Sequence, residues 1–404
     1  MFLAFAFFGK VTLGGETLLP ADNVFAWAPW RAYATQAGVQ GPHNALLSDL
    51  YLENYAWKRF ILQALRARQL PLWNPYILTG VPFLAAGQHS ALYPLSLLFY
   101  IVPLSAAYGW FAALHLFLAG AFTYLLARTL GLRRGAATLA GLTFEGCGFL
   151  VISNVFPMIV AAAIWLPVIL MAIERMARRE AHGAPFLGHI ADLLYGSAAI
   201  GMAMLAGHPE MYYYVGITAA LYGLWRMATL AKHRKSALKM AGLLLAMAAI
   251  GIGLGAAQWL PLLDLVRYNV RQGGASFQEV LGWAYPKRHL LALILPDFYG
   301  NPSHHRYLDL FTGRLTPVTV NALGQAIRST EWGIKNYVEG AAYVGVLPLV
   351  LTAVALLRRK ARETGFFVGL AILSLLFAFG SPIYYLIYKL PGFSQVHTPF
   401  RWVY

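Results

Sequence analysis

The sequence has little charge and almost no cysteine. Charged residues make up 12% of its 404 positions and hydrophobic residues 59%, whereas an average soluble domain carries about 25% charged residues. Such a chain cannot hide its apolar surface from water, so a lipid bilayer is the expected solvent. The single cysteine, Cys147, permits no intrachain disulfide and excludes a zinc site built from cysteines.

Several motifs of soluble enzymes are also missing. The sequence contains no P-loop, no dinucleotide-binding fingerprint and no G-x-S-x-G, so we expect no nucleotide. His289, His304 and His305 match no standard metal spacing, and we predict no metal site. The net charge of +15 is divided among short basic runs instead of one stripe, which favours anionic lipid headgroups over nucleic acid as the partner.

What the sequence does have is a series of long apolar segments. Eight of them suit membrane helices, and the apolar stub at 1–8 is far shorter than the roughly 20 residues that cross a bilayer. The sequence therefore predicts an all-α polytopic membrane protein with about nine transmembrane helices. We expect a fragment whose first helix is truncated and which lacks whatever follows the ninth. The eight segments cover residues 106–127, 136–153, 155–173, 190–206, 210–228, 240–262, 341–357 and 365–380.

Basic residues between these segments predict the orientation. Four clusters are separated by pairs of spans, so all four lie on one face, which the positive-inside rule assigns to the cytoplasm. The expected divisions are a truncated helix at 1–8, a first long extracytoplasmic loop at 9–105, a helix bundle at 106–262, a second long extracytoplasmic loop at 263–340, and the last helices with an extracytoplasmic tail at 341–404. The clusters are Arg128, Arg133 and Arg134; Arg175, Arg178 and Arg179; Arg226, Lys232, Arg234, Lys235 and Lys239; and Arg358, Arg359, Lys360 and Arg362.

The first loop contains two segments that favour short helices. The apolar segment 91–104 is interrupted by prolines, and we interpret it as interfacial or re-entrant because a span here would move the later basic clusters outside. Residues 55–69 predict an amphipathic helix suited to a membrane surface. Its apolar side would carry Phe60, Ile61 and Leu65, with Lys58, Arg59, Arg66 and Arg68 elsewhere.

Most acidic residues, including Asp297, fall on the predicted outer face, where a cavity could open. Asp49 precedes the amphipathic helix. Desolvation by Trp57 and neighbouring tyrosines would suit it to be a general base, while N-capping of that helix is the simpler alternative. Asp22 is either a second carboxylate or part of an Asx turn.

Two further candidates lie at the predicted outer ends of spans. His208 and Glu210, in the motif AGHPE, form either a tight turn or the rim of the cavity. Glu339 opens the next span from the outside, where a helix N-terminus favours a carboxylate in any case.

Seven motifs follow one another over most of the chain: DLYLENYAWKRF, LPLWNPYILTGVPF, YP, AGHPE, LPDFYGNP, NYVEGAAYVGVLPL and FSQVHTPFRW. Together they resemble the bacterial YfhO-type membrane protein family, which is similar to the GT-C superfamily of polytopic glycosyltransferases. The resemblance implies a GT-C-like fold in the bacterial cytoplasmic membrane. It also implies transfer of a sugar from a polyprenyl-phosphate donor to an envelope glycopolymer or lipid acceptor on the extracytoplasmic face.

The resemblance further implies an essential aspartate in the first outer loop. Asp49 is preferred because it directly precedes the helix of the first motif, Asp22 follows the first span more closely, and Glu210 is a further catalytic candidate. The superfamily's motif of two acidic residues within three positions is absent, so the cofactor is unknown and a divalent metal stays open.

Phosphate and sugar contacts complete the expected site. Arginine donates two hydrogen bonds to phosphate oxygens, although contact with lipid headgroups is an equal alternative for each outer arginine. The phosphate set is Arg267, Arg271, Arg288, Arg401 and His208, and the sugar or acceptor set is Trp57, Trp73, Asn74, Tyr76, Gln88 and Glu339. Two other functions stay open: a lipid or polyprenol-phosphate transporter or flippase using the same cavity, and a non-catalytic protein of envelope assembly.

Overall fold

The structure, a computed structural model, is mostly helical and divides into two compact units. The first unit combines Met1–Leu19, Leu52–Gly146 and Asn154–Asn269, and the second combines Pro20–Tyr51, Cys147–Ser153 and Val270–Tyr404. The structure describes residues 2–268, 274–301, 306–309, 313–317, 337–338, 340–358, 362–390, 392–395 and 398–403.

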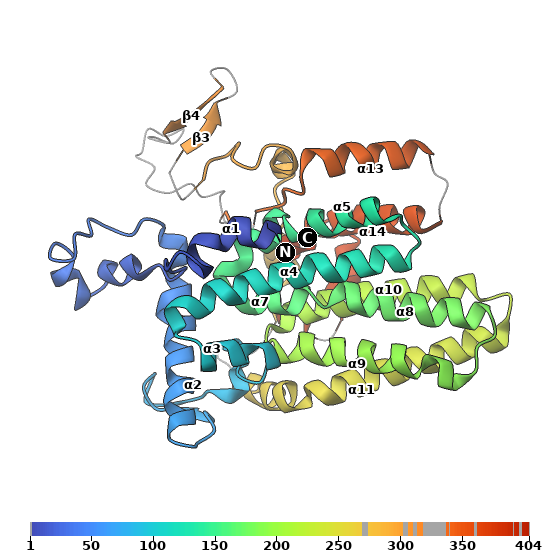
Figure 1. Ribbon diagram of the computed structural model, residues 1–404, viewed down its shortest axis with the longest axis horizontal. Coiled ribbons are helices and arrows are strands. Elements are labelled where there is room, and N and C mark those ends of the chain that lie inside the picture. The colour runs from blue at the N-terminus through green and yellow to red at the C-terminus, as the bar shows by residue number, and fades with distance from the viewer. Residues whose placement is uncertain are drawn as a thin grey trace. The chain divides into compact units, whose positions relative to one another are not determined.

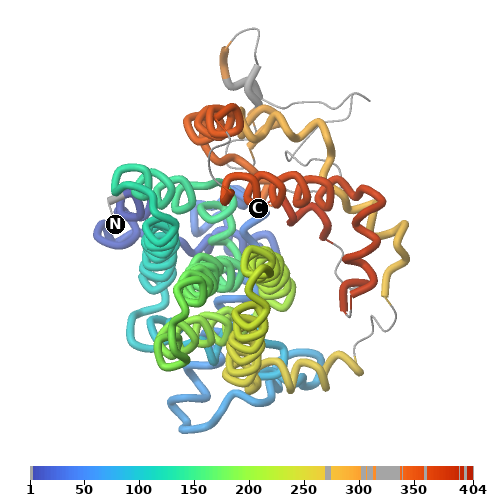
Figure 2. Tube along the Cα trace, turned by 90° about the vertical axis from the view of Figure 1, so that its right-hand side faces the viewer, coloured from blue at the N-terminus to red at the C-terminus, as the bar shows by residue number. Residues whose placement is uncertain are grey.

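The first unit is built around a bundle of long helices. Figure 1 shows α4, α8, α9, α10 and α11 running alongside one another, with α2 lying across them, and Figure 2 looks nearly along the bundle. The elements of this unit are α1 (Phe2–Thr12), α2 (Ala56–Arg66), β1 (Trp73–Asn74), β2 (Val81–Pro82), α3 (Leu98–Ile101), α4 (Leu104–Thr129), α5 (Arg134–Glu145), α7 (Pro157–Ala163), α8 (Leu166–Ala181), α9 (Ile190–Leu205), α10 (Pro209–Thr229) and α11 (Arg234–Val266).

Four helical segments, counted over the described residues, are long and apolar enough to cross a membrane, which marks the chain as a membrane protein. A fifth results if the consecutive helices Arg134–Glu145 and Gly148–Val155 form one broken span. The nine spans expected from the sequence therefore stay a prediction. The four segments are Leu104–Thr129, Pro157–Ala181, Phe186–Leu205 and Arg234–Val266.

Proline and glycine explain where several of these helices break. Pro157 and Pro167 occupy the first turns of α7 and α8, and the backbone between them leaves the α-helix at Ile164 and Trp165. A proline lacks the N–H that an interior turn needs, so it is tolerated at a helix start. The span expected at 136–153 is likewise interrupted, because the helix ends at Glu145 and restarts at Gly148.

The amphipathic helix expected at 55–69 is present as α2, but one of its cations was assigned to the wrong side. Lys58 is only 1% exposed and Ile61 lies beside it, also buried. The prediction failed because the stem of a lysine is apolar and can pack inward wherever a partner receives the ammonium group. The segment 91–104 forms only the short helix α3 before α4 begins after Pro103, so it is not a spanning helix.

The second unit holds shorter elements that are tied together by backbone hydrogen bonds. Tyr285 N–H donates to the Ala378 carbonyl at 2.7 Å, and Gly148 N–H donates to the Tyr343 carbonyl at 2.7 Å. Its described elements are α6 (Gly148–Ile152), α12 (Phe277–Gly282), β3 (Arg306–Asp309), β4 (Arg314–Pro317), α13 (Val346–Arg358), α14 (Arg362–Ala378) and α15 (Tyr384–Tyr388), with β3 antiparallel to β4.

Candidate functional site

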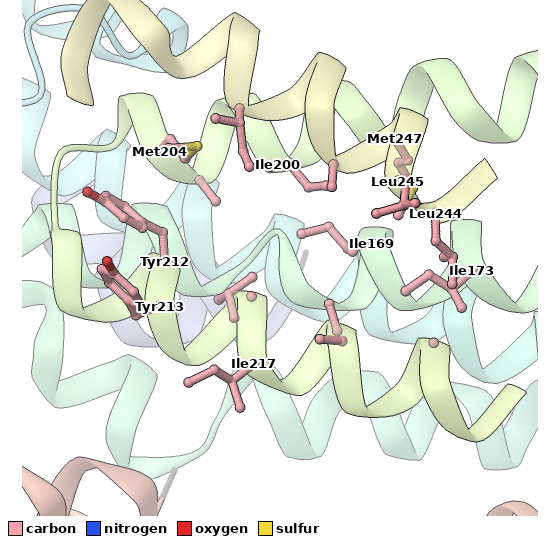
Figure 3. A pocket seen from close by; sticks show the side chains of 18 of the residues that line it. Ile169, Ile173, Ile200, Met204, Tyr212, Tyr213, Ile217, Leu244, Leu245 and Met247 are labelled. Carbon is pink, nitrogen blue, oxygen red and sulfur yellow. The ribbon is translucent and has the colours of Figure 1, made fainter. Parts of the chain in front are cut away.

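An apolar pocket of about 840 Å³ lies among α8, α9, α10 and α11 in the first unit. Figure 3 shows Tyr212 and Tyr213 at one end, with Ile173, Leu244 and Met247 towards the other end. Its lining is almost entirely apolar, with Tyr212, Tyr213 and Trp259 among mainly aliphatic residues. A pocket of this size and polarity, inside a bundle of membrane helices, suits a long hydrocarbon chain rather than a polar metabolite.

Glycines explain how such a pocket is accommodated. On one side α9 and α11 touch closely: a Cβ on Gly251 would lie 2.6 Å from Ile200 Cβ, and one on Gly255 would lie 2.8 Å from Met204 Cβ. On the other side α10 lines the pocket with both small and large residues, and a Cβ on Gly216 would meet nothing within 4 Å. The pocket therefore lies beside a place where α11 packs on α9 at backbone distance, and it is open next to Gly216 of α10.

One end of the bundle, which we call the loop end, is covered by residues 83–93. Ser90 Oγ donates to the Ala206 carbonyl at 2.7 Å, and the Gln258 side chain donates to the Leu84 carbonyl at 3.1 Å. Gly207, with φ of +86°, leaves no room for a side chain, because a Cβ there would collide with the carbonyl of Gly87. The loop is thus seated on the turn between α9 and α10 by backbone contacts.

Lys58 fixes the same loop from the opposite side. Its ammonium donates to the His89 carbonyl at 2.6 Å and lies 4.4 Å from the centre of the Phe99 ring. Burial lowers the pKa of Lys58 to about 7 and that of His89 to about 4. The His89 ring is therefore neutral, accepting from Ala91 N–H at Nδ1 and donating from Nε2 to the Phe83 carbonyl.

The opposite end of the bundle, which we call the charged end, contains three buried carboxylates. Asp192 lies 2.8 Å from Arg175 Nε and 2.7 Å from Arg179 Nε. Glu174 lies 2.5 Å from Arg178 Nε and 3.0 Å from Arg226 Nε, and accepts from the Tyr222 hydroxyl at 2.7 Å; Glu180 lies 2.6 Å from Lys239 Nζ and 2.7 Å from His189 Nε2. These pairs tie α8 to α9, α10 and α11.

The two preferred catalytic carboxylates lie in the second unit. Asp49 is exposed and has no hydrogen bond or ion pair within the described ranges. It does not cap the amphipathic helix α2, which is preceded by Tyr55 and has no side-chain cap. Asn44 caps the short 3-10 helix Ala45–Leu47 instead, accepting from Leu46 N–H at 3.1 Å. Asp22 is half-buried and accepts from His43 N–H at 2.6 Å, which orders the loop between them.

A third carboxylate of the second unit has the more elaborate surroundings. Asp297 Oδ1 accepts from the Tyr337 hydroxyl at 2.9 Å and from the Asn301 amide at 3.0 Å. Burial and the neighbouring carboxylate raise the pKa of Tyr337, so its hydroxyl keeps the proton that it donates. The motifs LPDFYGNP and NYVEG, distant in sequence, meet in this cluster, which the sequence placed on the outer face without giving it a role.

The candidates of the first unit are placed mainly by local turns. His208 caps α10, its Nδ1 accepting from Met211 N–H at 3.2 Å, and Glu210 accepts from the Tyr214 hydroxyl at 2.7 Å. Asn74 is buried and accepts from Tyr76 N–H at 3.0 Å. Trp73, Tyr76 and Gln88 are exposed, and Trp57 is half-buried.

The residues of the predicted phosphate set are divided between the two units, with Arg267 in the first and Arg288 and Arg401 in the second. Arg267 is exposed and forms an ion pair at 3.8 Å with Asp264, which is exposed as well. Arg288 is exposed and lies over the Tyr299 ring, while Arg401 is half-buried over the Phe400 ring. Arg271 and Glu339 lie outside the described residues. Within the described ranges, no group of three or more His, Cys, Asp or Glu side chains could hold a metal ion.

Sequence reasoning missed the carboxylates of the charged end, the inward Lys58 and the apolar pocket. A usable signal existed for the first: Glu174 and Glu180 alternate with arginines on one helix, and Asp192 opens the next. In comparisons with protein-family models, curated proteins and solved structures, no match was found for this chain.

Proposed function

We propose that this protein is a membrane glycosyltransferase whose donor sugar is carried on a polyprenyl phosphate. The apolar pocket among α8, α9, α10 and α11 carries the proposal, because a chain of isoprene units needs an aliphatic site at the depth of the bilayer. The resemblance of its motifs to those of the YfhO-type family favours glycosyl transfer as the reaction.

The reaction would need one carboxylate and no nucleotide. An acceptor hydroxyl attacks the anomeric carbon of the donor, the new C–O bond forms as the bond to the phosphate oxygen breaks, and the acceptor's proton passes to a carboxylate. Polyprenyl phosphate leaves with the electron pair. Asp49 and Asp22 remain the proposed bases, and the exposure of Asp49 leaves it open to an acceptor.

Filling the pocket tests the lipid part of the proposal. Gly216→Leu adds an aliphatic side chain where a Cβ meets nothing within 4 Å, and we expect binding of polyprenyl phosphate to weaken at least tenfold. Gly253→Leu is the matched control, because Gly253 is an exposed helical glycine that also has nothing within 4 Å and does not line the pocket. Binding is measured on purified protein in nanodiscs. Equal affinities for the two variants would exclude the pocket as the lipid site.

Transfer is tested in the same preparation by release of polyprenyl phosphate from a polyprenyl-phosphate hexose, with envelope membranes supplying the acceptor. If Asp49 is the base, Asp49→Asn abolishes release and leaves lipid binding unchanged. If Asp22 is the base instead, Asp22→Asn has this effect. If wild-type protein binds the lipid but releases no polyprenyl phosphate, the transferase proposal fails, and a carrier of the lipid becomes the better reading.

A further inference from the structure

A second pocket, of about 510 Å³, lies between α2 and the segment that leads into α4. One stripe of α2, formed by Arg59, Leu62 and Arg66 at helical spacing, lines it together with Tyr55, the residue that precedes the helix. The floor is apolar, formed by residues such as Phe99 and Val102. The pocket thus joins a positively charged edge to an apolar base.

The two arginines are arranged to act together. Seven residues correspond to about 10.5 Å along a helix and almost two full turns, so both side chains leave α2 on the same side, with Leu62 between them. Burial of Lys58 and Ile61 fixes this rotation of α2, because it turns their side inward and leaves Arg59 and Arg66 exposed. Long side chains at this spacing can converge on one tetrahedral anion.

Neither arginine has a counter-charge among the residues that the structure describes. Throughout the part of the chain that the structure describes, Arg59 and Arg66 make no ion pair, hydrogen bond or ring contact. In contrast, every arginine bound to a carboxylate at the charged end reaches it within 3.0 Å. The first turn of α4 adds a positive end, since Leu104 and Ser105 line the same pocket and helix N-termini favour anions.

We propose that this pocket binds a phosphate group, with Arg59 and Arg66 holding the phosphate oxygens and the apolar floor receiving the first carbons of the chain that carries it. This shared chemistry covers the phosphate of a membrane lipid and free phosphate. The site is distinct from the phosphate set predicted from the sequence, which contains neither arginine. Phosphate binding at this pocket does not depend on glycosyl transfer, because the two arginines would hold the phosphate whether or not a sugar is attached.

Binding of phosphatidic acid to the protein in phosphatidylcholine nanodiscs tests the site, because polyprenyl phosphate would also bind through the apolar pocket among α8, α9, α10 and α11. Arg59→Gln with Arg66→Gln is expected to lower the affinity for phosphatidic acid at least tenfold, and each single change about fivefold. Arg68→Gln is the matched control, because Arg68 is exposed, lies two residues beyond Arg66 and does not line the pocket. It should change the affinity less than twofold.

Inorganic phosphate added as a competitor distinguishes the two sources. If millimolar phosphate competes with the lipid, and this competition disappears in the double variant, the site is supported and free phosphate is a ligand. If the lipid binds and phosphate does not compete, the site is supported and its ligand is the phosphate of a lipid. The site is overturned if the double variant binds phosphatidic acid like wild type, or if Arg68→Gln loses as much affinity. Loss of transfer without loss of phosphate binding concerns the proposed reaction alone.

Discussion

At the charged end of the helix bundle, three buried carboxylates hold Arg175, Arg178, Arg179, Arg226 and Lys239 in place. At the loop end, the buried ammonium of Lys58 is held by a carbonyl and a ring, and the two arginines of the second pocket have no partner among the described residues. The two ends therefore use the same residue types for different purposes.

The difference separates structural cations from available ones. A cation that a buried carboxylate already holds has its hydrogen bonds committed, and removing either partner leaves an uncompensated charge. A cation without a counter-charge, at the edge of a pocket, keeps its donors for a ligand. Composition and loop position do not distinguish the two, because both ends contribute to the same net charge of +15.

The largest expected effect comes from removing a charge at the charged end. Glu174→Gln leaves Arg226, whose side chain is 13% exposed, without its counter-charge, and we expect the free energy of unfolding to fall by about 3 kcal/mol. Thermal unfolding in detergent measures the change. Glu16→Gln, at an exposed position with no ion pair to any described residue, is the control and should change the stability little. Equal stability of the two variants would show that the buried pairs do not hold the bundle together.

A somewhat smaller effect is expected at the loop end. Gly207→Ala forces a Cβ against the carbonyl of Gly87. We therefore expect the free energy of unfolding to fall by about 2 kcal/mol more than the strain of a positive φ alone would cause. Gly183→Ala isolates that strain, because Gly183 has a φ of +69° and nothing within 4 Å. Limited proteolysis should also cut residues 83–93 faster in Gly207→Ala alone. Matching losses of stability in both variants would mean that the loop does not depend on this contact.

The smallest effect, per unit of pH, is a dependence of stability on pH at Lys58. Its folded-state pKa of about 7 lies below the ordinary value of 10.5, so the unfolded chain binds more protons between these values and stability rises with pH. Below pH 7 both states are protonated and the full cost of burial is present. Relative to Lys58→Met, the unfolding free energy of wild type should rise by up to about 1.4 kcal/mol per pH unit between pH 7 and 10.

Lys10→Met, in which an exposed lysine is replaced, should follow the wild-type curve. Parallel curves for wild type and Lys58→Met would show that the ammonium is better solvated than its burial indicates.

Hydrophobic runs were enough to predict a helical membrane protein, and the amphipathic pattern predicted α2. Local rules did not predict how those helices face one another. The inward side of Lys58 depends on a carbonyl 31 residues away, and the pairing of Glu174 with Tyr222 joins residues 48 positions apart. Such contacts are set by the packing of several helices, which a periodic pattern does not specify.

The candidate site was less predictable than the fold. Residue type and position in the sequence favoured Asp49 as the general base, but Asp49 is exposed and without a partner in the described part of the chain. Asp297, in contrast, has two donors on one oxygen. The pocket could not be foreseen at all, because a run such as Ile169 to Ile173 reads equally as lipid-facing or cavity-lining until its neighbours are known.

The glycine contacts of α9 with α11 also limit how one wall of the apolar pocket can move. Backbones already at contact, as at Gly251 and Gly255, cannot approach further or slide without collision. On α10 the contacts are mixed, because a Cβ on Gly216 would meet nothing within 4 Å whereas one on Gly223 would lie 3.0 Å from Leu244 Cδ1. A bulkier guest would therefore be accommodated on the α10 side next to Gly216, since the wall formed by α9 and α11 has no room to yield there.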